Sequence, residues 1–316
     1  MRKNFVTYDG KSTVISACDE FLEMPIDKIT VSERIEIMKT AKVIILAGQS
    51  NAVGVGFIKY LPRYFDEATV ARLMEGYERV RIHYASHDIR NHSFVKTTVN
   101  CTEATKNTVG PEMGIAKRLT ERTPDEDYFI VKCAFGGSDM HNGWRSPQSG
   151  VPYREELTAE PAKALVDPAY QFPGWCYNAL IKLIRDSFAQ LETAGYVPEV
   201  IGFCWMQGEA DSLPPFADPY IDRYDCMLRD LRDTFAPRFD RCVYADAGIS
   251  EIWGDYELMN ARKRAYAETH GHVFVDTVAA GLTTRLEPEE EPDTYHYDAG
   301  SVIKLGEMFA DAVLGG

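Results

Sequence analysis

The feature that most constrains the fold is the run Val43–Ala47, which leads directly into Gly48-Gln49-Ser50-Asn51. Five consecutive apolar residues, most of high β propensity, predict a buried strand, and the glycine followed by small polar residues predicts a tight turn at its end. Ligands of open parallel sheets bind at the carboxyl ends of the strands. We therefore expect the Ser50 hydroxyl to lie at the end of the sheet where ligands bind.

Similar apolar runs alternate with longer amphipathic segments from Lys42 onward. The predicted strands are Val43–Ala47, Val80–Tyr84, Tyr128–Ala134, Val200–Met206, Cys242–Asp246 and His272–Asp276. The predicted helices are Pro111–Thr120, Trp175–Glu192, Tyr220–Thr234, Leu258–His270 and Ser301–Val313. Because almost purely apolar strands that alternate with helices are typical of parallel sheets covered on both faces, we expect an α/β protein.

The first forty residues look different from the rest. We expect residues 1–40 to form an N-terminal extension that packs on a main domain spanning 41–316. Thr30-Val31-Ser32-Glu33 has the pattern of a capping box and predicts one short helix in this extension. Within the main domain, residues 85–108 and 136–174 are predicted to be long irregular segments, and loops of that length in a compact domain are usually functional.

Composition excludes several classes of partner. The chain has 316 residues, a net charge of −14 and a pI near 5.0, which argue against nucleic acid or an anionic membrane as the main partner. No apolar run approaches the roughly 18 residues that a membrane span requires. The first residues are not followed by an apolar signal core, so we expect a cytoplasmic protein.

Cysteine and histidine usage predicts no metal site. The seven cysteines are scattered without metal-ligand spacing, and we expect them to be reduced and mostly buried. His83 and His87 are four residues apart, but this stretch is predicted to be a strand entering a loop, which does not suit a zinc site.

A serine hydroxyl needs a base before it can act as a nucleophile. Asp293-Thr294-Tyr295-His296 supplies one, because an aspartate three residues before a histidine can accept a hydrogen bond from one ring nitrogen while the other faces outward. We predict Ser50 as nucleophile, His296 as base and Asp293 as the orienting acid. Asp298 is a competing acid, but it looks more like the cap of the final helix. Taken alone, each motif is also compatible with an ordinary turn.

Acyl transfer also needs donors for the negative charge that develops on the carbonyl oxygen, and each well-placed donor is typically worth about 2.7–4 kcal/mol. Gly136-Gly137 follows one predicted strand, and adjacent glycines let backbone N–H groups approach a ligand. Gln207 follows another predicted strand and is itself followed by a glycine. We predict that the amides of Ser50 and of Gly136 or Gly137, together with the Gln207 side chain, form an oxyanion hole. The alternative is that both glycine sites are plain turns.

Further polar and aromatic residues follow the same two strands. Glu209 and Asp211 resemble the paired carboxylates of glycosidases, but their spacing suggests instead that they bind loop backbone or a neighbouring hydroxyl. In the loop after the glycines, Trp144 could stack on a sugar ring and Arg145 could meet a carboxylate such as that of sialic acid. Alternatively, Trp144 packs the loop onto the sheet.

Together these motifs resemble the SGNH-type (GDSL-type) hydrolases. The sequence is most similar to the branch that contains sialate O-acetylesterases and the acetylxylan esterases of carbohydrate esterase family six. The matching motifs are Gly48-Gln49-Ser50-Asn51, Gly136-Gly137, Trp205-Met206-Gln207-Gly208-Glu209-Ala210-Asp211 and the terminal Asp293-x-x-His296. The resemblance covers residues 42 to 314. Gln49 stands where the wider superfamily has aspartate, and Gln207 takes the place of its asparagine donor, as this branch would show.

The resemblance implies a three-layer α/β/α sandwich of flavodoxin-like type, with a parallel sheet of about five strands. It implies a serine esterase that removes O-acetyl groups from a small acetylated sugar through an acetyl-enzyme, with no metal or organic cofactor. Gln49, Asn51 and Glu209 would support the site. Unlike in α/β-hydrolases, the serine follows the first core strand, and acid and base share one turn.

Two alternatives remain open from the sequence. An esterase or thioesterase that acts on a non-carbohydrate acyl substrate would keep the same motifs. A non-catalytic carbohydrate-binding relative would usually lose the serine or the histidine, and this chain keeps both.

Overall fold

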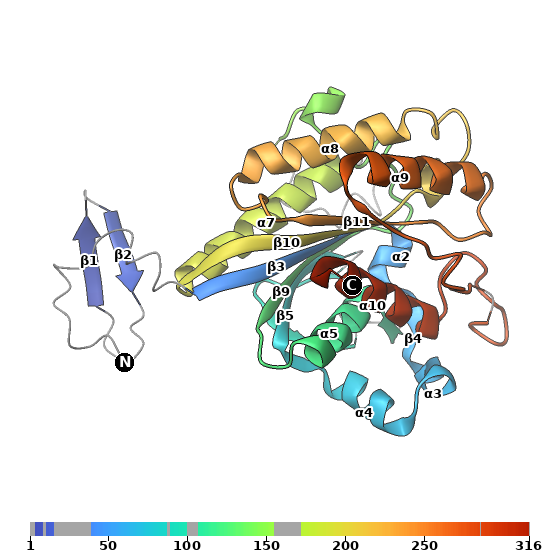
Figure 1. The fold of residues 1–316 in the computed structure, drawn as a ribbon, viewed down its shortest axis with the longest axis horizontal. Coiled ribbons are helices and arrows are strands. Elements are labelled where there is room, and N and C mark those ends of the chain that lie inside the picture. Colours follow the sequence, from blue (N-terminus) through green and yellow to red (C-terminus); the bar gives the residue numbers. More distant parts are fainter. Residues whose placement is uncertain are drawn as a thin grey trace.

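A single twisted sheet organises the molecule (Figure 1). The structure is a computed structural model that describes residues 4–8, 11–15, 39–86, 89–99, 107–154, 172–284 and 286–315. In this part of the chain the sheet has the order β12-β11-β10-β3-β9-β5-β6. Its parallel strands are β3 (Lys39–Gly48), β5 (Tyr77–Ser86), β9 (Tyr128–Ala134), β10 (Tyr196–Met206), β11 (Val243–Ala247) and β12 (Val273–Val275). The short strands β6 (Ile89–Arg90) and β7 (Val95–Thr97) pair with β5 in antiparallel orientation.

The strand order explains where a ligand should bind. If β5 is set aside, the order β9-β3-β10-β11-β12 is the 2-1-3-4-5 order of flavodoxin-like sheets. The chain leaves β3 towards one side of the sheet and later returns to β10 on its other side, so the order reverses beside β3. Ser50 lies just after the carboxyl end of this strand. The predicted fold class is therefore confirmed, with β5 as an additional parallel strand beyond β9.

Helices cover both faces of the sheet (Figure 1). α5 (Pro111–Arg122) and α10 (Ala299–Leu314) lie on one face, and α7 (Trp175–Thr193), α8 (Tyr220–Phe235) and α9 (Tyr256–His270) on the other. The backbones of α5 and α10 are in direct contact at Gly114. A Cβ at this position would lie 1.9 Å from the Ile303 carbonyl oxygen. Glycine is required at this crossing.

Shorter elements fill the connections. After β3 come α2 (Ser50–Val53), α3 (Leu61–Tyr64) and α4 (Glu67–Glu75). β4 (Gly56–Phe57) pairs with β8 (Thr108–Val109), and one-turn 3₁₀ helices span Ile58–Tyr60, Pro147–Ser149 and Glu209–Asp211. The predicted irregular segment 85–108 therefore contains short strands, since β6, β7 and β8 all begin within it.

Near the N-terminus, β1 (Asn4–Tyr8) and β2 (Lys11–Ile15) form an antiparallel pair that the sequence analysis did not predict. The short helix expected at 30–33 lies outside the described residues. β3 begins at Lys39, two residues before the predicted start of the main domain. No helix in the described ranges has both the length and the apolar character that crossing a membrane requires.

The core follows the expected pattern of buried strands. Every side chain of β9 is buried, and so are the side chains of residues 43–47 of β3. Of the cysteines in the described ranges, all are free, and Cys133, Cys176 and Cys204 are buried. His83 is buried too, with its Nδ1 2.8 Å from the Ser187 hydroxyl. Among the described residues, no cluster of histidine, cysteine or carboxylate side chains could hold a metal ion.

Candidate active site

The turn after β3 presents Ser50 on a constrained backbone. Gly48 has φ +145°, and a Cβ there would lie 1.9 Å from the Met206 carbonyl oxygen, so only glycine fits. The Gln49 N–H donates to that same oxygen at 2.9 Å, which ties the turn to the end of β10. α2 begins at Ser50, and the hydroxyl therefore sits at the start of a one-turn helix. The residue is only 9% exposed.

The predicted acid and base lie against each other. His296 Nδ1 is 2.5 Å from Asp293 Oδ2, and Asp293 Oδ1 accepts a hydrogen bond from the Tyr295 N–H at 2.9 Å. Partial burial acts to raise the pKa of Asp293, but the hydrogen bonds from His296 and Tyr295 outweigh it and hold this pKa below its ordinary value. The carboxylate is therefore ionised at neutral pH and fixes the orientation of the imidazole.

Asp298, the competing acid, faces elsewhere. It occupies the N-cap position of α10, but its carboxylate accepts hydrogen bonds from the Thr283 hydroxyl at 2.6 Å and from the Leu286 N–H at 3.0 Å. Its side chain holds the preceding loop and does not hydrogen-bond His296.

Asn51 joins the serine turn to the histidine loop. Its Oδ1 accepts a hydrogen bond from the Tyr297 N–H at 2.9 Å, and its Nδ2 donates to Glu209 Oε1 at 2.8 Å. Since Ser50 precedes Asn51 and His296 precedes Tyr297, this contact sets the two candidate catalytic residues on neighbouring backbone. The structure contains no direct hydrogen bond between the two side chains, and such bonds often form only with substrate in place.

This contact leads to a first prediction. Asn51→Ala should lower kcat by roughly tenfold to a hundredfold with a smaller change in KM, because a displacement of the base from the nucleophile on the order of 1 Å is costly. Steady-state kinetics on p-nitrophenyl acetate would measure the effect. Asn91→Ala is the matched control, since the Asn91 amide likewise accepts a hydrogen bond from a backbone N–H and donates one from its nitrogen, but lies beside β5. Equal losses of kcat in both variants would contradict the positioning role.

The glycine loop after β9 lies beside the same turn. The Phe135 N–H donates to the Gly48 carbonyl at 3.1 Å, which fixes the start of the loop to the end of β3. Gly137 has φ +67°, and nothing lies within 4 Å of where its Cβ would be, so the loop is open on that side. Within the described residues, no acceptor binds the backbone N–H groups of Ser50, Gly136 or Gly137.

Gln207 is more deeply buried and makes more hydrogen bonds within the protein than predicted. Its side chain is fully buried, and Nε2 lies 2.7 Å from Asp211 Oδ2, 3.1 Å from Gln49 Oε1 and 3.3 Å from the Ser138 carbonyl. The amide nitrogen carries two hydrogens, so both already have acceptors in the protein. Gln207 thus holds three loops together, and the predicted contact with an oxyanion would require one of these bonds to break.

The two motif carboxylates bind protein groups. Asp211 accepts hydrogen bonds from the Met140 and His141 N–H groups at 2.8 and 3.0 Å, and burial raises its pKa to about 6. Burial also raises the pKa of Glu209, which holds the Asn51 amide and is 2% exposed. Both side chains therefore act as structural acceptors, as their spacing suggested, and not as an exposed glycosidase pair.

The predicted substrate contact at Trp144 is wrong. Trp144 is completely buried, donates from Nε1 to the Ser138 hydroxyl at 2.9 Å and packs edge to face on Trp205. It packs the loop onto the sheet, which was the alternative. Arg145 donates from Nη2 to the Ser149 carbonyl within its own loop, and its predicted contact with a substrate carboxylate stays a prediction.

The sequence analysis missed two buried lysines behind the site. Lys132 of β9 lies 2.6 Å from Glu112 and donates to the Val53 carbonyl at the end of α2. Lys263 of α9 donates to the Gln207 and Ala247 carbonyls, each at 2.5 Å. The only signal was the position of Lys132, a single charged residue in an otherwise apolar strand.

An exposed tyrosine that packs on a partly buried tryptophan was missed as well. Tyr295, next to His296, is 55% exposed, and its ring centroid is 5.4 Å from that of Trp253. This pair offers an accessible aromatic face beside the candidate base.

Comparisons with known proteins identify the family and the fold. The family model described as carbohydrate esterase, sialic acid-specific acetylesterase matches residues 40–315. Among curated proteins, no sequence matches this chain. The fold is similar to that of NanS, with TM-score 0.61 and 16% identity over 88% of this chain and 98% of the other. A protein from Arabidopsis thaliana gives TM-score 0.56 and 19% identity over 88% and 99% of the two chains. A carbohydrate acetylesterase from Xanthomonas citri gives 0.52 and 16% over 87% and 57%.

Proposed function

The chain belongs to the carbohydrate esterase, sialic acid-specific acetylesterase family, and we propose that it removes O-acetyl groups from sugars through an acetyl-Ser50 intermediate. One observation carries the assignment of the residues. The Asn51 side chain accepts the Tyr297 N–H and thereby holds the Ser50 turn against the Asp293–His296 pair.

The first half of the reaction forms the acetyl-enzyme. His296 Nε2 takes the proton of the Ser50 hydroxyl while Oγ attacks the acetyl carbonyl carbon, and Asp293 stabilises the imidazolium that results. The N–H groups of Ser50 and of Gly136 or Gly137 receive the negative charge on the carbonyl oxygen. Collapse of the tetrahedral intermediate breaks the bond to the sugar oxygen, which takes the proton from His296.

The second half releases acetate. His296 removes a proton from water, the resulting hydroxide attacks the acetyl carbon, and the bond to Ser50 Oγ breaks. The proton returns to Oγ, so the enzyme ends in its starting state. The unpaired N–H groups again bind the oxyanion, because the second tetrahedral intermediate has the same charge distribution as the first.

The sugar ring needs a contact surface in place of Trp144. We assign this role to the exposed ring of Tyr295, which packs on the partly buried Trp253, because an exposed aromatic ring offers a large apolar face to a sugar. Tyr295 adjoins His296 in sequence, so a sugar stacked there would hold its ester close to the base. We also propose that residues 41–316 form the esterase domain, with 1–40 as an N-terminal extension that packs on it.

Acetate release from defined sugars tests the proposal. The purified full chain is incubated with an O-acetylated sialic acid, an acetylated xylo-oligosaccharide and p-nitrophenyl esters of increasing acyl length. We expect acetate from at least one acetylated sugar, preference for acetyl over longer esters, and labelling of Ser50 by a fluorophosphonate probe.

The other outcomes separate the alternatives. Labelling of Ser50 with turnover of longer esters or thioesters alone would identify a non-carbohydrate acyl hydrolase. Neither labelling nor turnover, in a chain that still binds acetylated sugars, would identify a non-catalytic relative.

A further inference from the structure

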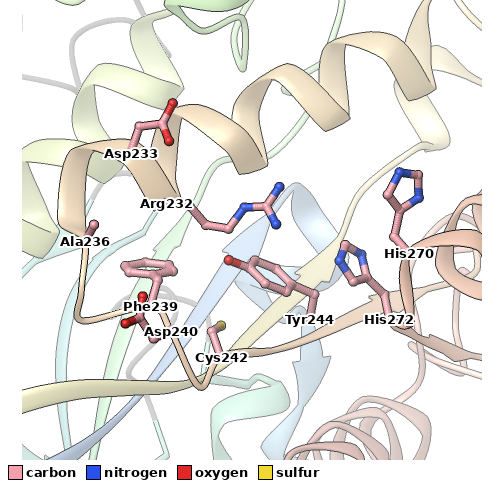
Figure 2. Close-up of a pocket in the computed structure, with 10 residues that line it drawn as sticks. Arg232, Asp233, Ala236, Phe239, Asp240, Cys242, Tyr244, His270 and His272 are labelled. Carbon is pink, nitrogen blue, oxygen red and sulfur yellow. The ribbon is translucent and has the colours of Figure 1, made fainter.

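A cavity lies at the end of the sheet opposite to Ser50 (Figure 2). It is bounded by the end of α8, the start of β11 and the turn that leads from α9 into β12, so it meets the amino ends of these parallel strands. Its volume is about 510 Å³, which falls in the usual range of small-molecule sites. Its lining residues include Arg232, Asp233, Asp240, Tyr244, His270 and His272.

Arg232 is an exposed residue that brings a positive charge to the cavity, over a floor that contains Tyr244 and His272. The guanidinium carbon lies 5.7 Å from the centroid of the Tyr244 ring, and no carboxylate among the described residues forms an ion pair with it. Figure 2 shows its guanidinium reaching over the tyrosine. Burial lowers the pKa of His272 to about 4, and the positive charges of His270 and Arg232 act in the same direction.

Two buried polar atoms at this floor lack good partners. Tyr244 is 6% exposed, and no oxygen or nitrogen of the described residues hydrogen-bonds its hydroxyl. The thiol of Cys242 is its polar neighbour, and a thiol is only a weak partner. His272 Nδ1 is buried and equally unpartnered. Because buried polar groups in proteins are normally satisfied, the pair points to a ligand.

Among the described residues, the carboxylates around the cavity form no ion pair with Arg232. In Figure 2 the Asp233 carboxylate points away from Tyr244, and it accepts a hydrogen bond from the Gln148 amide at 3.3 Å. Asp225, on the same helix, is paired with Arg229 at 2.9 Å and with the Tyr266 hydroxyl at 2.8 Å. Asp240 lies near Phe239, on the other side of the cavity from the histidines.

We propose that this cavity binds an organic anion of about monosaccharide size. Arg232 would pair with its carboxylate or phosphate group, since the planar guanidinium matches two oxygens of either. Tyr244 and His272 would complete the hydrogen bonds. The site is separate from the esterase chemistry, so it stands whether or not the proposed function does.

Calorimetric titration of the full chain tests this site. The probes are a hexose 6-phosphate, inorganic phosphate, N-acetylneuraminate and, as a neutral control, the free hexose. We expect saturable binding of an anionic probe and none of the free hexose, and the probe that binds identifies a phosphate or a carboxylate. Arg232→Gln should weaken binding at least tenfold and Tyr244→Phe severalfold.

Arg241→Gln is the matched control. It removes the same charge one residue from Cys242, but Arg241 does not line the cavity and its side chain is 81% exposed. The affinity of the Arg241→Gln variant for the anionic probe should equal that of the natural chain. In the natural chain, the imidazole NMR signals of His270 and His272 should shift when the probe binds. Failure of every anionic probe to bind, or equal weakening by Arg232→Gln and Arg241→Gln, would overturn the proposal.

Discussion

Ser50→Ala should lower kcat on p-nitrophenyl acetate by at least about 10⁴-fold, because the reaction loses the atom that carries the acetyl group. The fold should be unaffected. The Ser50 hydroxyl has no hydrogen-bond partner among the described residues, and alanine is favourable in a helix. We expect the free energy of unfolding to change by no more than about 0.5 kcal/mol.

A second serine provides the control. Ser187 is buried on α7, where its hydroxyl lies 2.8 Å from His83 Nδ1 and donates to the Leu183 carbonyl. Ser187→Ala should therefore destabilise the protein by roughly 1 kcal/mol and leave kcat unchanged. If Ser50→Ala kept more than about a hundredth of the activity with an unchanged circular dichroism spectrum, the nucleophile would be another residue; the expected loss is far larger.

The fold was predictable because its signals are local. β9 coincides with the predicted Tyr128–Ala134, and α7 starts at the predicted Trp175. Runs of apolar residues in the strands and amphipathic periodicity in the helices each lie within one segment. The position of β5 beside β9 was not predictable in this way, since strand order depends on contacts between segments far apart in the chain.

In the candidate site, too, contacts between neighbouring residues could be predicted and contacts between distant residues could not. Asp293 and His296 are three residues apart, so their contact follows from spacing. Asn51, however, meets Glu209 and Tyr297 across 158 and 246 residues, and no local pattern predicts such contacts. The sequence left two interpretations of Trp144 open for the same reason, because its burial depends on packing against Trp205 of β10.

Lys132 shows why the remaining support of the site escaped prediction. Lysine is almost never fully buried unless it is paired, and a sequence does not show the pairing. Here the Lys132–Glu112 ion pair is completely buried, with a separation of 2.6 Å, and it joins β9 to α5. The same ammonium group binds the Val53 carbonyl, which ends the one-turn helix that begins at Ser50. The pair therefore links the core to the nucleophile turn.

Lys132→Met should lower the free energy of unfolding by about 3–5 kcal/mol, because it leaves the Glu112 carboxylate buried without its counter-charge. Guanidinium chloride denaturation would measure this. Burial raises the pKa of Glu112, and the charge of Lys132 counteracts this rise. Loss of Lys132 would therefore raise the pKa of Glu112 further. When the folded-state pKa of a carboxyl group is raised, the protein becomes less stable as the pH rises through that value. The deficit of the variant should therefore be larger at pH 7 than at pH 5.

A double variant and a surface lysine complete the test. Lys132→Met combined with Glu112→Leu should recover most of the stability, since apolar residues often replace buried ion pairs at little cost. Lys42→Met removes an ion pair with Glu126 in which both side chains are at least one-third exposed, and it should cost no more than about 1 kcal/mol. If the double variant regains its stability but its kcat stays low, the bond from Lys132 to Val53 positions the nucleophile turn. Full recovery of both would limit the lysine to neutralising Glu112.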